Sequence, residues 1–507
     1  MKKSRKSTKR NSSFKRAPIK KATFVHTQSQ HEFSNLFTFP SSSTISVSDN
    51  NSENELNKSF DNLFSTKTDQ KIPIFFFINP KSGSTDGRAI LNFASEFTNE
   101  SSIRCPKITL QSIVEGSLMS ISAYLINILD KDEMEDGIQL LKTMTETHKE
   151  KLKVLIGGGD GTVLSLIDVL NEKGINIAQL IFGPVPLGTG NDLSNALGFG
   201  GSMMFEQDEF FLFDLLFMYE IASESKIDIW NLELKVEDRK GRVCNIEKNK
   251  EQEIVEYNEK KEKNIPIKIL NKTFINYCSI GYEARVGFSF EKIRSKNRIM
   301  NKWIYFWKAL KKYTRCCRKN YALKNLVYSF QVGEAATSKP YTKQKNRFFT
   351  NNILYEINNS SSNIILNGDP ISIVCQNINY YLGGSKDIWK NSGSNIGLTH
   401  LDNNSEEEKN FLYEKANSEQ RFDDKKLEFF TYESEVALGL ENIFSGHANK
   451  IYHGNGPVRI VFRKGVKDKV YLNIDGEYLR IYNPEYIKIK LDDRICNGQI
   501  SFLRRFG

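Results

Sequence analysis

The sequence predicts an α/β fold in two parts: an N-terminal parallel α/β domain and a C-terminal, antiparallel β-rich domain. Between about residues 71 and 225, short apolar runs alternate with stretches of helical periodicity. After residue 225 this alternation is lost, and strand-like segments dominate up to residue 495. Three glycine-rich turns follow three of the N-terminal apolar runs, as expected where the strands of a parallel sheet end.

The N-terminal domain, residues 71–225, opens with a short apolar run. Ile72 to Ile78 reads IPIFFFI and is followed by Asn79-Pro80, which is typical of a buried strand. Further along, the pattern predicts helices at 86–97, 116–129, 133–148 and 162–173, and strands at 153–156 and 177–187. Strands that alternate with helices favour a parallel sheet with helices on both faces.

The second domain, residues 226–495, is expected to be antiparallel and rich in strands. Segments such as KIDIWNLELKVE and KVYLNI are strand-like, and one long helical stretch runs from Asn297 to about Arg318. Two polar stretches, 238–264 and 334–367, are expected to be surface insertions, which loops tolerate at small entropic cost. Residues 496–507 are expected to form a tail.

Composition limits the class of protein without deciding it. The 507 residues carry a formal net charge of +10, which nucleic acid, anionic lipid or nucleotide would each match. The apolar stretch from Phe210 to Ala222 is shorter than the roughly 18 residues of a membrane-spanning helix, and the N-terminus does not resemble a secretory signal. The seven cysteines lack metal-ligand spacing. We therefore expect a cytoplasmic protein that associates with membranes peripherally.

Two basic segments each allow a plain and a functional interpretation. Residues 1–70 are rich in Lys, Arg, Ser and Asn and are predicted to be a disordered basic arm. This arm is either a solvated tail or a tether to anionic membrane, where each basic residue contributes about 1 kcal/mol. Lys292 to Arg315 interleaves basic and aromatic residues. It predicts an amphipathic helix that packs on the core, presents lysines to anionic lipid or, as a lesser alternative, contacts nucleic acid.

The three glycine turns carry the predicted chemistry. They are NPKSGS at 79–84, GGGDGT at 157–162 and PLGTGNDLS at 186–194. Without side chains, glycines let the backbone approach phosphate oxygens, and helices that begin after the turns add their positive ends. No P-loop string is present. The predicted nucleotide-binding residues are Asn79, Lys81, Ser82, Gly83, Gly158, Gly159, Gly161, Thr162, Gly188, Thr189, Gly190 and Asn191. Lys81 could equally be an ordinary exposed loop lysine.

At these turns the chain resembles the eukaryotic diacylglycerol kinases. NAD kinases, phosphofructokinases and sphingosine kinases share a GGDGT-like motif, but LGTGNDL is more specific to the diacylglycerol kinase branch. The resemblance covers roughly residues 72–490, because FINYCSIGYEARV (from Phe274), FDDKKLEFF (from Phe422) and NIDGEYL (from Asn473) resemble the accessory domain of those enzymes. It implies a fold like that of NAD kinase and diacylglycerol kinase. No cysteine-rich C1 module is found in the sequence.

The sequence also departs from the pattern of that family. Tyr282-Glu283-Ala284 stands where the family typically has Val-Asp-Ala, which keeps the charge but lengthens the side chain. Lys425 follows Asp424 where a glycine is common, and INYYLGG replaces a turn like IPSYGGG. These changes keep the reaction plausible and leave the lipid preference open.

The resemblance also implies roles for four carboxylates. Phosphoryl transfer requires neutralised phosphates, a metal ion and a positioned base. Asp160 either orients an ATP–Mg²⁺ complex or touches the acceptor hydroxyl. By resemblance, Glu477 is the general base, and Asp424 and Asp475 belong to the Mg²⁺ site. As turn residues, all four are also open to a purely structural role.

The expected function is ATP-dependent phosphorylation of diacylglycerol to phosphatidic acid, with ATP and Mg²⁺ as cofactors. The expected partners are diacylglycerol and an anionic membrane surface; no nucleic acid is expected, and no obligate protein partner can be inferred. Two alternatives remain: a sphingoid-base or ceramide kinase, and a catalytically inactive nucleotide-binding scaffold.

Overall fold

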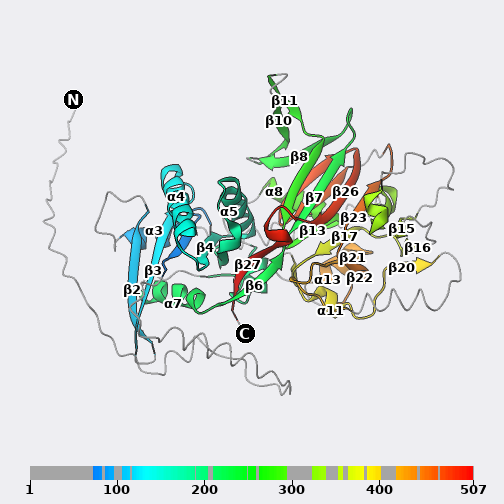
Figure 1. The fold of residues 1–507 in the computed structure, drawn as a ribbon. Helices are drawn as coiled ribbons and strands as arrows, with labels where there is room; N and C mark the ends of the chain where they lie inside the picture. The colour runs from blue at the N-terminus through cyan, green and yellow to red at the C-terminus, as the bar shows by residue number, and fades with distance from the viewer. Residues whose placement is uncertain are drawn as a thin grey trace, which may run out of the picture.

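A computed structural model gives the fold of the chain (Figure 1). The described residues are 72–82, 86–95, 105–114, 117–188, 190–203, 209–247, 249–258, 262–293, 322–338, 352–357, 364–381, 385–400, 418–441, 446–465 and 469–505. The predicted basic arm at 1–70 and the predicted helix from Asn297 to Arg318 lie outside these ranges, as do the predicted site residues Gly83 and Thr189.

The N-terminal part is built on one seven-stranded sheet, which confirms the predicted α/β architecture. In spatial order its strands are β2 (Lys107–Val114), β3 (Ser117–Asn127), β1 (Ile74–Ile78), β4 (Leu152–Gly158), β5 (Leu180–Pro186), β27 (Gln499–Arg504) and β6 (Ser223–Asp228). From β3 to β27 neighbouring strands are parallel, whereas β2 and β6 pair antiparallel at the two edges. All five residues of β1 are buried, which explains its continuous apolar sequence.

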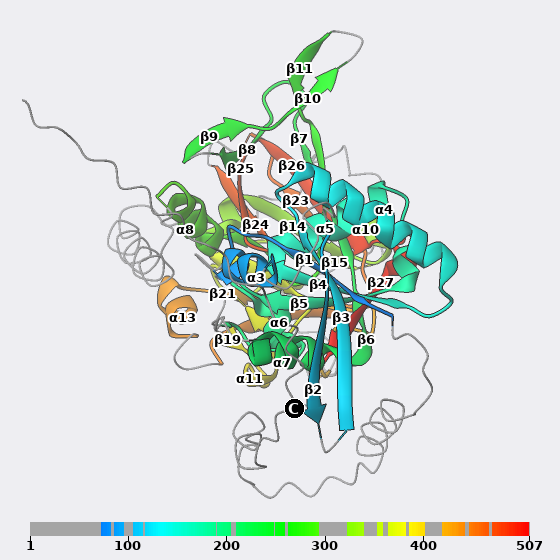
Figure 2. The same cartoon turned by 90° about the vertical axis from the view of Figure 1, so that its left-hand side faces the viewer.

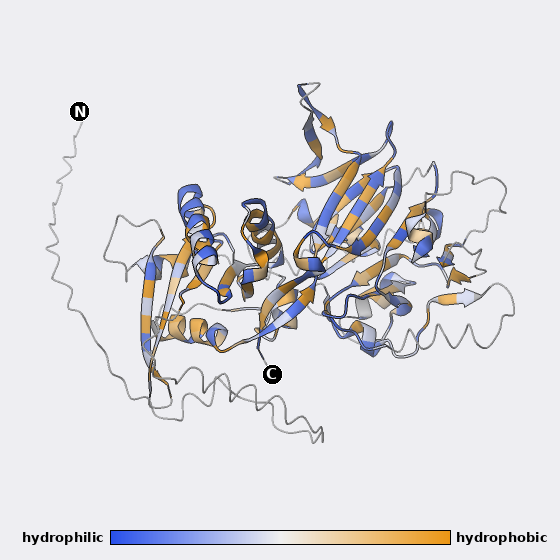
Figure 3. Cartoon of the chain, in the orientation of Figure 1, coloured by the Kyte–Doolittle hydropathy of each residue, from blue (hydrophilic) through white to orange (hydrophobic). Residues whose placement is uncertain are grey.

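Helices cover both faces of this sheet. They are α3 (Asp86–Ser95), α4 (Lys131–Thr147), α5 (Asp160–Glu172), α6 (Asp192–Ala196) and α7 (Glu209–Glu220), with a 3₁₀ turn at Ile177–Gln179. Figure 2 shows α4 and α5 on one side of the sheet and α7 on the other. Figure 3 shows α7 apolar around its circumference, as expected of a buried helix. Its residues Leu212, Leu216 and Tyr219 are each 0% exposed.

One N-terminal element differs from the prediction. Residues 116–129 were predicted to be a helix, but Ser117–Asn127 form the strand β3. Met119, Ile121, Ala123 and Leu125 are buried at every second position, which is the period of a strand. Pairing with β2 on one side and β1 on the other satisfies the backbone of β3.

The C-terminal part consists of two eight-stranded sheets, which confirms the predicted antiparallel β-rich domain. The first contains β12 (Ile269–Phe274), β7 (Trp230–Val236), β26 (Pro484–Leu491), β23 (Val458–Phe462), β14 (Val327–Val332), β15 (Leu354–Ile357), β16 (Ile364–Leu366) and β20 (Leu398–His400). The second contains β22 (Asn449–Gly454), β21 (Leu427–Tyr432), β17 (Ser372–Gln376), β13 (Tyr277–Gly281), β24 (Val470–Ile474), β25 (Glu477–Tyr482), β8 (Arg242–Glu247) and β9 (Lys250–Glu253).

The two sheets share one apolar core. Leu232 and Phe330 from the first sheet and Leu472 from the second are all 0% exposed and belong to it. The Phe330 ring meets the Phe429 ring edge to face, with centroids 5.2 Å apart. Short elements surround this sandwich: α8 (Tyr282–Glu291), α10 (Glu334–Thr337), α11 (Ile388–Asn391), α13 (Glu435–Leu440) and the pair β18 (Tyr380–Tyr381) and β19 (Ser385–Lys386).

Three predicted segments have a different role in the structure. The expected tail, 496–507, contains β27, which lies between β5 and β6 in the N-terminal sheet. The expected insertion at 238–264 supplies β8 and β9 to the second sheet and the separate hairpin of β10 (Val255–Asn258) and β11 (Lys263–Pro266). Figure 1 shows that hairpin projecting from the molecule. β15 and β16 likewise derive from the insertion predicted at 334–367.

Candidate functional site

The three glycine turns lie side by side at the carboxyl ends of β1, β4 and β5. The backbone N–H of Asn79 donates to the carbonyl of Gly157 at 2.9 Å, which joins the first turn to the second. The N–H of Gly188 donates to the carbonyl of Gly158 at 2.9 Å, which joins the second turn to the third. The convergence that a parallel sheet predicts is therefore present, with direct backbone contacts between the turns.

Two of the glycines are required by the packing of these turns. A Cβ on Gly188 would lie 2.3 Å from the Cα of Gly159, and a Cβ on Gly158 would lie 2.5 Å from Thr162. By contrast, a Cβ on Gly161 or Gly190 would meet nothing within 4 Å. Gly188 therefore lets the backbones of the second and third turns touch, and Gly158 makes room for the side chain of Thr162. Gly161 and Gly190 instead leave space beside the backbone for an approaching ligand.

Asparagine side chains shape the first and third turns. Asn79 accepts the N–H of Lys81 at 3.0 Å. Asn191 is 2% exposed, accepts the N–H of Gly188 at 3.1 Å and donates to the carbonyls of Gly188 and Gly201. Both amides are thus engaged with the protein backbone in this structure, and Lys81 is exposed. Their predicted contacts with a nucleotide stay a prediction, and the observed role of Asn191 is to hold its turn closed.

Asp160 begins α5 and connects the second turn to the third. Its carboxylate accepts the N–H of Asp192 at 2.9 Å and the N–H of Leu193 at 3.4 Å, both at the start of α6. Burial raises the pKa of Asp160 well above its ordinary value; the charges of Asp192 and Asp475 add to the rise, and the two N–H donors oppose it. Asp160, Asp192 and Asp475 therefore share one electrostatic site.

The opposite wall of this site comes from the β-rich part of the chain. Tyr277, at the start of β13, donates its hydroxyl to the Oδ2 of Asp192 at 3.2 Å. Tyr277 is 5% exposed and its ring meets the ring of Tyr381 edge to face at 4.8 Å. Burial raises the pKa of Tyr277 well above its ordinary value, with the charge of Asp192 as the next cause. The hydroxyl therefore stays protonated and acts as a donor.

Asp475 and Gly476 form the two-residue turn between β24 and β25. Both have positive φ, +44° and +86°, which is the geometry that an Asp-Gly hairpin provides. The carboxylate of Asp475 accepts backbone N–H groups from Ile275, Asn276 and Tyr277 at 2.8, 3.0 and 2.8 Å. Burial raises its pKa to about 7, against these three donors. The turn is thus fixed to the residues that precede and begin β13.

Glu477 follows this turn at the start of β25. Its Oε2 accepts from the Nζ of Lys272 at 2.8 Å, and its side chain is 44% exposed. The ion pair lies on the surface, where such pairs contribute little to stability. Burial raises the pKa of Asp168 on α5, and the charge of Lys272 opposes this rise. Lys272 therefore interacts with the candidate base and with a carboxyl of the N-terminal part of the chain.

The two predicted metal ligands occupy different environments. The oxygens of Asp475 are taken up by backbone N–H groups. Asp424 accepts the N–H of Lys426 at 3.0 Å, and it helps burial to raise the pKa of Asp228 to about 6. Across the described ranges, no group of three or more His, Cys, Asp or Glu side chains is placed to hold a metal ion. The roles of Asp424 and Asp475 at a Mg²⁺ site stay a prediction.

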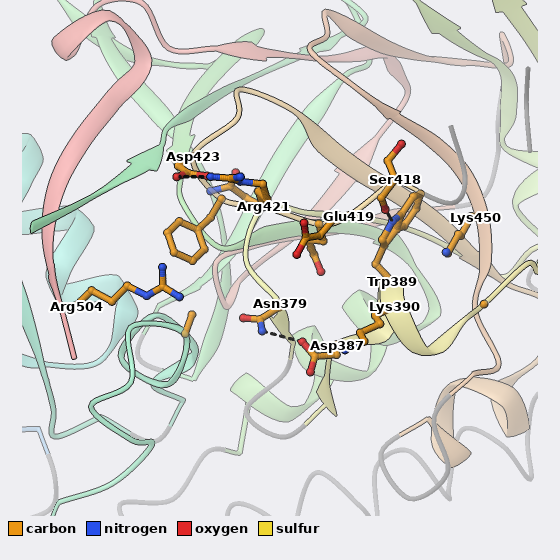
Figure 4. Close-up of a pocket in the computed structure, with 15 residues that line it drawn as sticks. Asn379, Asp387, Trp389, Lys390, Ser418, Glu419, Arg421, Asp423, Lys450 and Arg504 are labelled. Carbon is orange, nitrogen blue, oxygen red and sulfur yellow. Dashed lines mark hydrogen bonds and ion pairs between the residues drawn. The ribbon is translucent and has the colours of Figure 1, made fainter. Parts of the chain in front are cut away.

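A separate polar hollow of about 610 Å³ opens where the two parts of the chain meet (Figure 4). Ala196 and Arg504 contribute from the N-terminal sheet and its helices, and Trp389 and Lys450 from the β-rich part. Figure 4 shows Arg421 paired with Asp423, and Asn379 hydrogen-bonded to Asp387. None of the residues that line the hollow belongs to the glycine turns. It is therefore distinct from the site at Asp160.

The sequence predicted Asp160, Asp475 and the glycine turns as site residues, and their roles stay a prediction. It did not predict Asp192, Tyr277 or Lys272, which the structure places beside predicted site residues. The sequence does carry a signal for Asp192, because this residue stands in the third glycine turn and is directly followed by a helical turn. Tyr277 and Lys272 carry no local signal. Their partners lie 85 and 205 residues away, so only the folded chain brings them together.

Comparison with known proteins assigns both parts of the chain to one family. The family model of the diacylglycerol kinase catalytic domain matches residues 73–210, and that of the diacylglycerol kinase accessory domain matches residues 273–478. Together the matches cover more than half of the 507 residues. In the part of the chain that the structure describes, we find no helix with the length and apolar character to cross a bilayer.

Individual relatives agree with the family models. Diacylglycerol kinase 4 of Arabidopsis thaliana is 27% identical over 250 residues, which are 46% of this chain and 48% of that protein. Human diacylglycerol kinase iota is 26% identical over 245 residues, 46% of this chain and 18% of that protein. The matched region thus spans less than half the length of these relatives.

Among solved structures, yeast NADH kinase with NADH aligns with 86% of this chain and 85% of its own at 9% identity. Its TM-score is 0.33, too low to support an argument. The family models match both halves of the site, the turns around Asp160 and the strands around Tyr277 and Asp475. The chain therefore belongs to the diacylglycerol kinase family.

Proposed function

We propose that this chain is an ATP-dependent diacylglycerol kinase that transfers the γ-phosphoryl group of ATP to diacylglycerol and forms phosphatidic acid. The observation that carries the proposal is the arrangement around Asp160. Three glycine turns meet on one wall, and the Asp475-Gly476 turn is fixed to the other through β13. Tyr277 and Asp192 bridge the two walls. Phosphoryl transfer needs such a site, with the nucleotide on one side and the acceptor on the other.

In this proposal the residues of one wall bind the nucleotide, and those of the other wall act on the acceptor hydroxyl. The open backbone at Gly161 and Gly190, with the N-terminal end of the thirteen-residue helix α5, favours the negative phosphates of ATP. ATP arrives as its Mg²⁺ complex, in which phosphate oxygens and water molecules are ligands of the ion and one or two protein carboxylates can add to them. Asp160 orients that complex through its fixed place between α5 and α6.

Glu477 is the proposed general base for the acceptor hydroxyl. Its exposed carboxylate stands directly after the anchored turn, and the 2.8 Å contact with the Nζ of Lys272 orients the side chain. Glu477→Gln should lower kcat by about 10²-fold or more, with little change in KM for ATP, because the glycine turns are untouched. Steady-state kinetics with varied ATP would check this. A near-normal kcat would move the role of base to Asp160.

The direct test is transfer of radiolabelled phosphate from ATP to a panel of lipids in mixed micelles with Mg²⁺. Diacylglycerol should be labelled, whereas sphingosine, ceramide and monoacylglycerol should be labelled poorly. Preferential labelling of sphingosine or ceramide would favour a sphingoid-base or ceramide kinase. ATP binding with no labelled lipid would favour the inactive scaffold.

Asp160→Asn is the matched inactive control. It keeps one oxygen that can accept the N–H groups of α6, so the fold should persist with little change in Tm. The loss of the charge should raise the concentrations of ATP and Mg²⁺ needed for half-maximal rate and lower the rate itself. Wild-type kinetics in this variant would refute the assignment of Asp160.

The proposed place of action is the surface of an anionic membrane, from the cytoplasmic side. A water-soluble enzyme must reach diacylglycerol where that lipid resides, and a net charge of +10 favours anionic surfaces. Co-sedimentation with vesicles that contain phosphatidylserine, compared with neutral vesicles, would test this. Equal binding to both would contradict it.

A further inference from the structure

We propose that Tyr277 is a positioning residue which sets the distance across the site, by holding Asp192 and Asp475 at the same time. This inference rests on the proposed function and deepens it, because it concerns how the two walls of the kinase site are aligned. The juxtaposition that carries it is simple. One residue of β13 contacts the carboxylate of one wall through its side chain and the carboxylate of the other wall through its backbone.

The contacts form a continuous chain across the site. Asp160 accepts the N–H of Asp192 at 2.9 Å, and Asp192 accepts the hydroxyl of Tyr277 at 3.2 Å. Tyr277 donates its own N–H to Asp475 at 2.8 Å, and Asp475 in turn donates its N–H to the carbonyl of Tyr277 at 3.0 Å. Glu477 follows two residues later. Three successive links, the last of them a reciprocal pair of hydrogen bonds between Tyr277 and Asp475, therefore relate the candidate base to the second glycine turn.

Burial makes this chain rigid. Tyr277 is 5% exposed and Asp192 is 1% exposed. A hydrogen bond in such surroundings is stronger than one in water. The ring of Tyr277 is fixed independently, by edge-to-face contact with Tyr381 inside an apolar cluster. Removing only the hydroxyl should therefore leave the ring in place and release the link between the walls.

The position of the link predicts which kinetic constant responds. All three glycine turns lie on the wall of Asp160, so ATP binding does not require the wall of Asp475. The reacting groups, by contrast, come from both walls and must be aligned to well within 1 Å. Loss of the link should thus lower kcat while leaving KM for ATP nearly unchanged.

The test is a double-mutant cycle with Tyr277→Phe and Asp192→Ala, measured as kcat and KM for ATP with diacylglycerol. Tyr277→Phe should lower kcat about tenfold or more, the scale of a lost hydrogen bond to a charged group, and change KM for ATP less than about twofold. In a protein that already carries Asp192→Ala, Tyr277→Phe should change kcat by less than about twofold. If Asp192→Ala does not fold, Asp192→Asn replaces it and should roughly halve the coupling.

A matched control is available in the same apolar cluster. The hydroxyl of Tyr432 is buried and makes no hydrogen bond among the described residues. Tyr432→Phe makes the same chemical change and should leave kcat as in the wild type. Equal loss of kcat from Tyr277→Phe with and without Asp192, or an effect on KM for ATP alone, would overturn the proposal.

The outcome can be separated from that of the kinase proposal. If the wild type phosphorylates no diacylglycerol, the proposed function fails, and the cycle is then measured by urea unfolding of the four proteins. Non-additive midpoints would support the link between Tyr277 and Asp192, and additive midpoints would refute it. An active wild type with an additive cycle in kcat refutes the positioning role alone.

Discussion

Glu283→Gln should change how the stability of this protein depends on pH. Glu283 lies on α8, is 1% exposed and stands where the family typically has aspartate. Its Oε2 accepts from the hydroxyl of Ser372, whereas its Oε1 is buried with no hydrogen-bond partner among the described residues. Burial raises its pKa from 4.5 to about 7, against the hydroxyl of Ser372. Glutamine keeps the shape of this side chain and cannot titrate.

The sign of the effect follows from proton binding. Between pH 4.5 and about 7 the unfolded chain has lost the proton of Glu283 while the folded chain keeps it. The folded state therefore binds more protons, and its stability falls as pH rises through this window, then levels off above 7. This shift in the pKa of Glu283 corresponds to about 3 kcal/mol of unfolding free energy, at 1.36 kcal/mol per pKa unit. The free energy of unfolding of Glu283→Gln, relative to that of the wild type, should therefore rise by up to about this amount between pH 5 and pH 8.

Thermal unfolding at half-unit steps from pH 5 to pH 8 would measure this. The Tm of the variant minus that of the wild type should rise with pH and become constant above pH 7. Burial also raises the pKa values of Asp228 and Asp475. Both proteins contain these residues, so their contributions cancel in the difference in Tm. Glu247→Gln makes the same change on an exposed side chain and should follow the wild type. A constant difference in Tm at all pH values would refute the reasoning.

Two further predictions concern the glycine turns and the N-terminal arm. Gly188→Ala should raise KM for ATP and lower Tm, because its Cβ would lie 2.3 Å from the backbone of Gly159; overpacking of this kind costs about 1–3 kcal/mol. Gly190→Ala, with nothing within 4 Å, should keep the wild-type Tm, and equal losses of Tm in both would contradict the packing argument. Deleting residues 1–70 should leave turnover in micelles nearly intact and weaken binding to anionic vesicles, as should added salt. Unaltered vesicle binding after deletion would refute the tether.

The sequence anticipated features that depend on local pattern and missed those that depend on distant partners. The apolar run before Asn79 and the glycine turns were sufficient to predict a parallel sheet with a ligand edge. Residues 116–129 were misread because Leu, Met and Ala favour helices locally. Hydrogen bonding to β1 and β2 outweighs that preference and makes 117–127 a strand.

The carboxylates show the same limit at the candidate site. The motif around Asp475 was recognised, but its three N–H donors lie about 200 residues earlier in the chain. A metal-ligand role was therefore predicted for a side chain whose oxygens are engaged by backbone. Asp192 stands in a recognised turn, but its contact with Tyr277, 85 residues away, is visible only in the folded chain.

The place of β27 has a consequence for how the chain matures during translation. β5 pairs at Phe182 with Phe502 of β27, which the ribosome synthesises after both sheets of the β-rich part. Until then β5 and β6 present open edges, and an unpaired edge invites pairing with other chains. A protein cut after residue 228, where β6 ends, would retain these edges permanently. The nucleotide-binding half is thus completed last although it is synthesised first, so chaperones would be needed most late in synthesis.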